Sequence, residues 1–348
     1  MPLGKKTHFE VSEAAEDWTV ERQGLLEKKI SEMGLKLEGS PLEKIVLQLY
    51  DELQSAGLEL KPPVFLADEW GCPEGVPAIG IPFFLADERL SRIEEEMMEM
   101  IEAKTEKEIL SYLRHEAGHA FNYAYRLYET EEWHDVFGPY SRPYRDDYQP
   151  NPFSRNYVRH IPGWYAQKHP DEDFAETFAV WLSPDSNWRE YYKEWGCYKK
   201  LLYVDRAAKK LGKSRPKVAV PDYVEDLSYS LAEHYQRFGH QPVKVPAYFD
   251  GDLKDIFEQK APKGKESEWL AADKFLTRHR RTLVWKINYW TGLNDAVVRG
   301  LVNHFIERTK SLNLWVDPRK STDVLLEIVA YATTLAMNKL YKGDFVIK

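Results

Sequence analysis

Apolar residues recur at helical spacing along much of the chain. Between residues 41 and 56 they occupy one face of a predicted helix, and Gly57 follows as its stop. The same spacing predicts further helices over residues 12–34, 87–103, 104–128, 171–183, 187–211, 270–290, 294–311 and 322–341. The pattern therefore indicates a mainly helical protein.

Two apolar stretches depart from this pattern and predict strands. They cover residues 60–67 and 78–85, and Gly and Pro residues dominate the segment between them. Pro82 lacks a backbone N–H, so the second stretch is expected to lie at the edge of a sheet. A small sheet beside many helices places the protein in the α+β class.

The regions between these elements suggest how the chain is divided. Residues 129–168 are rich in Tyr, Pro, Asn and Arg and show weak periodicity, which favours an ordered, functional loop. The Pro-containing stretch 239–252 is the best candidate for a boundary. We expect one domain over residues 1–245 and a helical segment over 246–348.

Composition and charge exclude several classes of protein. Formal net charge is −8, but residues 262–348 carry a surplus of +6, so the rest of the chain is strongly acidic. An acidic body argues against general nucleic-acid binding. The sequence has no apolar run long enough for a membrane helix, a polar N-terminus and only two cysteines. These features predict a soluble, cytoplasmic protein with no membrane contact.

The segment 113–121 contains the pattern H-E-x-x-H. His115 and His119 are four residues apart and share a helix face, so both imidazoles can reach one cation. Glu116 can hold a water that the cation polarises. Apolar neighbours predict burial of this helix, and a shared metal ion explains why it carries two histidines and a glutamate. The sequence therefore predicts a zinc site.

A third ligand is needed for a catalytic site. The metzincin extension requires Gly at position 122 and His at 125, but the chain has Asn122 and Tyr125. The alternative is a carboxylate from a second helix that begins at Pro170. Glu172 and Glu176 lie on its alanine-rich face, where a close approach to the His115 helix is possible.

Several motifs together resemble a known family. They are 75–86 (GVPAIGIPFFLA), 114–119 (RHEAGH), 157–160 (YVRH), 163–167 (GWYAQ), 169–170 (HP) and 172–178 (EDFAETF). Over residues 30–210 the chain resembles the bacterial zinc-binding metallopeptidases, a gluzincin-like family. The resemblance implies a zincin core with Glu172 as third ligand and Glu176 supporting a metal-bound histidine.

Further residues are expected to contact the substrate. Tyr165 lies on the loop that enters the Glu172 helix, and its hydroxyl suits an oxyanion donor. An extended peptide can add a strand beside Gly80 and Ile81. His160 is a further candidate for substrate contact.

Two functions fit these observations. The first is a zinc peptidase that hydrolyses peptide or protein substrates with a metal-activated water and Glu116 as general base. The second is a zinc-stabilised, non-catalytic binding protein whose basic C-terminal segment recruits a protein partner. Glu116 favours the peptidase, because a purely structural site has no use for that carboxylate.

Overall fold

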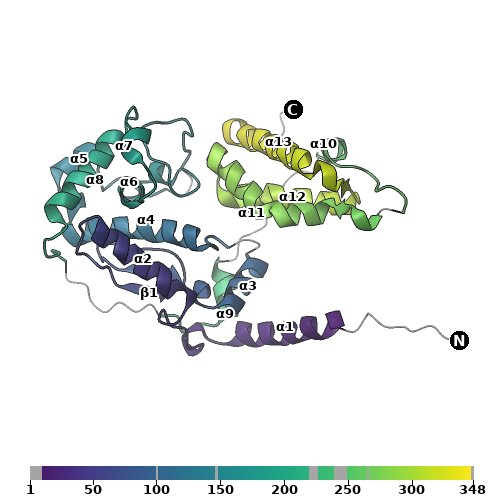
Figure 1. Cartoon of the computed structure of the whole chain (residues 1–348), viewed down its shortest axis with the longest axis horizontal. Coiled ribbons are helices and arrows are strands. Elements are labelled where there is room, and N and C mark those ends of the chain that lie inside the picture. Colours follow the sequence, from purple (N-terminus) through teal and green to yellow (C-terminus); the bar gives the residue numbers. More distant parts are fainter. Residues whose placement is uncertain are drawn as a thin grey trace. The chain divides into compact units, whose positions relative to one another are not determined.

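The computed structural model describes residues 10–98, 101–145, 148–218, 226–238, 249–264 and 266–345 (Figure 1). The chain divides into two units, residues 1–127 with 206–240, and residues 128–205 with 241–348. The structure is mostly helical with small sheets, which is compatible with the predicted α+β class. The boundary predicted after residue 245 lies outside the described residues.

The first unit is built around two packed helices and a short sheet. Its helices are α1 (Glu10–Glu27), α2 (Pro41–Ser55), α3 (Glu88–Met97), α4 (Glu106–Tyr125) and α9 (Leu231–Phe238). Helix α2 begins where the Ser40 side chain accepts a hydrogen bond from Leu42 N. It buries its apolar stripe, as the spacing predicts, and the structure shows that it contacts α4 (Figure 1).

The sheet of the first unit has two parallel strands, β1 (Val64–Ala67) and β2 (Ile79–Pro82). Both are shorter than predicted, and residues Phe83–Ala86 form a 3-10 helix instead of continuing the strand. Gly71 covers part of the outer edge of β2. Gly80 N donates to Gly71 O at 2.7 Å, and Gly71 N donates back to Gly80 O at 3.4 Å.

In the described part of the second unit, loops connect several helices and one two-stranded antiparallel sheet. Its chain first forms α5 (Glu131–Phe137), α6 (Pro170–Leu182), α7 (Trp188–Tyr191) and the beginning of α8 (Tyr198–Leu211). The later elements are α10 (Asp250–Ile256), β3 (Leu270–Ala271), α11 (Ala272–Thr291), α12 (Asp295–Ser311), β4 (Trp315–Val316) and α13 (Ser321–Lys342). Helix α11 contacts both α12 and α13.

Aromatic rings form much of the core around α6. The ring of Phe174 lies within 6.5 Å, centroid to centroid, of Trp133, Phe137 and Tyr203. Trp133 and Phe174 are fully buried. This agrees with the aromatic content of the sequence, and it gives α6 a rigid apolar side opposite its acidic residues.

Two further observations concern membrane-spanning helices and the cysteines. Among the described residues, no helix is both long and apolar enough to cross a bilayer. Cys72 is half-buried, Cys197 is buried, and both are free thiols.

Candidate metal centre

Helix α4 places the H-E-x-x-H residues in the interior. Thr105 and Glu108 form a capping box at its start, which satisfies two backbone donors and fixes where the helix begins. The helix ends at Arg126, which adopts the left-handed conformation. His115, Glu116 and His119 are all at least 94% buried. Three ionisable groups at such depth need partners, because an isolated buried charge is unfavourable.

Helix α6 begins with a histidine cap. His169 Nδ1 accepts a hydrogen bond from Asp171 N at 3.2 Å, and His169 Nε2 lies 2.7 Å from Arg142 O. These partners require Nδ1 to be the acceptor and Nε2 to carry the proton. Burial lowers the pKa of His169, which favours this neutral form. Pro170 is the first residue of the helix, and Glu172 lies in the same first turn.

Three side chains from α4 and α6 converge on one point. One ligand atom each of His115, His119 and Glu172 lies within 4.8 Å of the others, and all three residues are buried. His115 Nε2 and His119 Nε2 are 3.2 Å apart. A tetrahedral zinc with Zn–N distances of about 2.0–2.1 Å separates two nitrogen ligands by about 3.3 Å. The residues therefore fit a zinc ion, and they are the two histidines and the carboxylate that the sequence singled out.

Glu176 lies one turn after Glu172 and is 99% buried. Its Oε2 accepts a hydrogen bond from Ile161 N at 3.0 Å. The carboxylate therefore ties α6 to the loop before it, a role that sequence spacing did not reveal. The support of a metal-bound histidine by Glu176 stays a prediction.

Asp173 and Lys200 form a buried ion pair that the sequence did not reveal. Lys200 Nζ lies 2.5 Å from Asp173 Oδ2, and both side chains are at least 92% buried. Burial raises the pKa of Asp173 to about 7, although Lys200 acts in the opposite direction. Lys200 also donates to Asn156 O at 2.7 Å. The pair fastens the first turn of α6 to α8 and to the 148–168 loop.

The other predicted site residues are Tyr165, His160, Gly80 and Ile81. Tyr165 begins a 3-10 helix, η4 (Tyr165–Gln167), and is half-buried, as is His160. Gly80 and Ile81 are buried within β2. Since Gly71 already pairs with Gly80, a substrate strand could pair there only if Gly71 moved. The substrate contacts of these residues stay predictions.

Comparison with known proteins agrees with this geometry. Residues 79–241 match the model of a family described as "putative zinc-binding metallo-peptidase". The match includes β2, α4 and α6, and it confirms the resemblance seen in the sequence motifs. No curated protein and no solved structure matches the chain.

Proposed function

We propose that the protein is a zinc-dependent peptidase of the gluzincin type, with His115, His119 and Glu172 as the metal ligands. The buried cluster of two imidazoles and one carboxylate carries this proposal. Three protein ligands leave a fourth position for water, which is the catalytic pattern, whereas structural zinc sites are closed by four protein ligands. The family match and the small sheet next to α4 support a zincin-like core.

The chain supplies an acid–base group beside these ligands. Zinc bound there would polarise a carbonyl and lower the pKa of its water to about 7. Glu116 follows His115 directly on α4 and is buried. Its carboxylate is expected to accept a proton from the attacking water and to deliver it to the leaving amine. Because Glu116 is buried, bulk solvent should compete little with this proton transfer.

A digest of a peptide library tests the proposal. The zinc-loaded protein should contain about one zinc per chain and cleave peptides, because three ligands hold the metal and leave one position open. A chelator should abolish the cleavage, and added zinc should restore it. Mass spectrometry of the products measures the result and also reports the cleavage specificity.

Two outcomes of that digest contradict the proposal. Cleavage that persists after the metal has been removed would show that another group performs the chemistry. A protein that binds zinc but cleaves no peptide would favour the non-catalytic binding protein instead.

We also propose that Tyr165 donates a hydrogen bond to the oxyanion of the substrate. Tyr165→Phe keeps the ring and removes the hydroxyl, so zinc content and folding should not change. The kcat should fall by roughly 10²-fold, the usual effect of one lost oxyanion donor. Steady-state kinetics with a peptide identified in the digest provides the measurement.

The chain offers a matched control for this variant. Lys168 Nζ lies 4.9 Å from the ring centre of Tyr144 and 5.1 Å from that of Tyr165. Tyr144 is half exposed and stacks on His169. Tyr144→Phe should therefore leave kcat unchanged. Equal rates for wild type and Tyr165→Phe would make Tyr157 or His160 the next donor to test.

A further inference from the structure

Trp164 adopts a backbone conformation that only its surroundings can maintain. Its φ is 58° and its ψ is 41°, in the left-handed region that bulky residues seldom occupy. The side chain is 96% buried, and its indole Nε1 donates to Tyr289 O of α11 at 2.8 Å. Arg159 stacks on the ring, with its guanidinium carbon 4.4 Å from the ring centre. Helix α11 thus holds Trp164 in place.

The end of α11 fits closely against the same loop. Gly292 terminates the helix with a φ of +69°. A methyl group at this position would lie 2.5 Å from Pro150 Cγ and 3.1 Å from Trp164 Cδ1. Real Cβ atoms essentially never approach another atom to 2.5 Å, and 3.1 Å is unusually close, so a side chain at position 292 would displace Pro150 from α11.

Pro150 and Trp164 belong to the segment 148–168, which also contains hydrogen bonds of its own. Asn151 and Gln167 exchange two hydrogen bonds, from Asn151 N to Gln167 Oε1 at 2.8 Å and from Gln167 Nε2 to Asn151 O at 2.9 Å. Tyr148 donates its hydroxyl to Gly163 O at 2.6 Å. Burial, and then the charge of Glu176, raise the pKa of Tyr148, which keeps this donor protonated. The segment 148–168 is therefore held together by its own hydrogen bonds.

This segment touches the metal-ligand helix at a defined point. Ile161 N donates to Glu176 Oε2, and both residues are buried. Glu176 lies one helical turn from Glu172, so Ile161 contacts α6 close to the expected ligand. The segment also carries Tyr165 and continues directly into α6.

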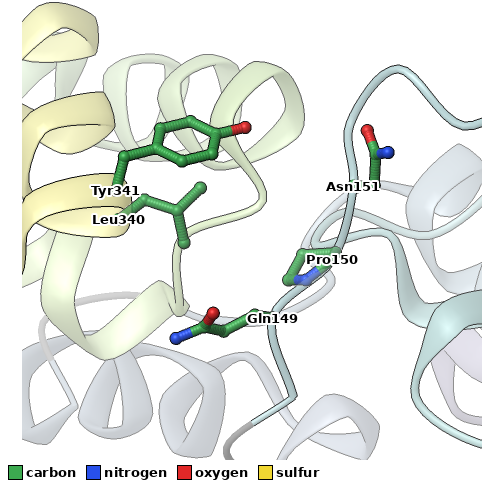
Figure 2. A pocket seen from close by; sticks show the side chains of 5 residues that line it. All are labelled: Gln149, Pro150, Asn151, Leu340 and Tyr341. Carbon is green, nitrogen blue, oxygen red and sulfur yellow. The ribbon is translucent and has the colours of Figure 1, made fainter.

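The segment also faces helix α13. Gln149, Pro150 and Asn151 face Leu340 and Tyr341 of α13 across a pocket of about 250 Å³ (Figure 2). Gly343 ends α13 with a φ of +79°, and among the described residues nothing lies within 4 Å of a methyl group built there. Among the described residues, the segment therefore has close contacts with α11, whereas a pocket lies between it and the last turn of α13.

We propose that helix α11 supports the metal site, and that Trp164 and Gly292 are positioning residues for Glu172. They act through the segment 148–168 and the hydrogen bond from Ile161 to Glu176. This inference rests on the proposed function, since it assumes that Glu172 binds the metal. It assigns helix α11 of the C-terminal segment a role in the proposed enzyme.

The two glycines provide a matched test. Gly292→Ala and Gly343→Ala both put alanine at a left-handed helix end, so the backbone cost is the same. Only Gly292→Ala meets Pro150. We expect it to weaken zinc binding by about 10-fold or more, the range for residues that orient a ligand. Gly343→Ala should bind zinc like wild type. Competition with a chelator measures affinity, and the absorption spectrum of the Co²⁺ form reports ligand geometry.

The outcomes separate this inference from the proposed function. A wild-type chain that binds no zinc would end the proposed function itself. A wild type that binds zinc, with Gly292→Ala equal to it in affinity and in Co²⁺ spectrum, would overturn the inference alone. If Gly292→Ala does not fold, Trp164→Phe decides by the same two measurements, because it keeps an aromatic ring and removes the donor to Tyr289 O.

Discussion

Replacement of Glu116 by glutamine is expected to stop peptide hydrolysis while leaving about one zinc bound per chain. Glutamine has nearly the same shape as glutamate but cannot accept the proton of the attacking water. General acid–base groups contribute about 10²–10⁴-fold to rate, so kcat should fall by at least this factor. The proposed ligands His115, His119 and Glu172 are untouched, so zinc content should not change. Kinetics and metal analysis on the same preparation measure both effects.

A control for this variant lies on the same helix. Glu106 is in the first turn of α4, pairs with Lys44, and is about two-thirds exposed. Glu106→Gln makes the same chemical change far from the buried residues, so kcat should equal that of wild type. If Glu116→Gln hydrolyses peptides at the wild-type rate, Glu116 is not the general base. If it also loses the zinc, the variant has disturbed the ligands, and its rate is uninformative about proton transfer.

The helices that carry the site could be predicted because their ends have local causes. The pattern predicted a helix over residues 104–128, and the structure has one over Glu106–Tyr125, begun by the Thr105 capping box. Pro170 marked the start of the second helix, and His169 caps it as a helix-start residue. The four-residue spacing of His115 and His119 fixes their common face in any helix.

Elements without such local causes were harder to predict. Residues Glu131–Phe137 form α5 within a stretch expected to be irregular, because seven residues hold too few periodic positions to reveal a helix. The helix predicted over 187–211 is instead α7 and α8 with a break between them. The strand prediction ran past Pro82 because Phe83, Phe84 and Leu85 are also buried, although they lie in a 3-10 helix.

The residues that support the site depend on contacts between distant segments. Asp173 and Lys200 are 27 residues apart, and Trp164 and Tyr289 are 125 apart. No local pattern marks such pairs, since each partner is an ordinary residue of its own helix or loop. An ordinary acidic cap was the alternative interpretation of the acids after Pro170. Their burial, which tertiary packing decides, shows that they are not a solvated cap.

Zinc affinity should fall in a fixed order when the two glutamates of α6 are truncated. Glu172→Ala removes a ligand, so we expect a loss greater than 100-fold. Glu176→Ala removes a group that orients the site, for which losses of 10–100-fold are typical. It also leaves Ile161 N buried without its acceptor, at a cost of about 1–3 kcal/mol in stability. Glu176→Gln keeps an acceptor oxygen for Ile161 N and should lie close to wild type if that hydrogen bond is its main role.

Competition with a chelator gives the three affinities, and thermal unfolding gives the stabilities in the absence of zinc. The metal-free protein separates the two glutamates, because Glu172→Ala should unfold at or above the wild-type temperature once a buried charge is gone, whereas Glu176→Ala should unfold lower. A larger loss of zinc affinity in Glu176→Ala than in Glu172→Ala would exchange their roles. It would make Glu176 the ligand beside His115 and His119, and Glu172 the carboxylate that supports the site.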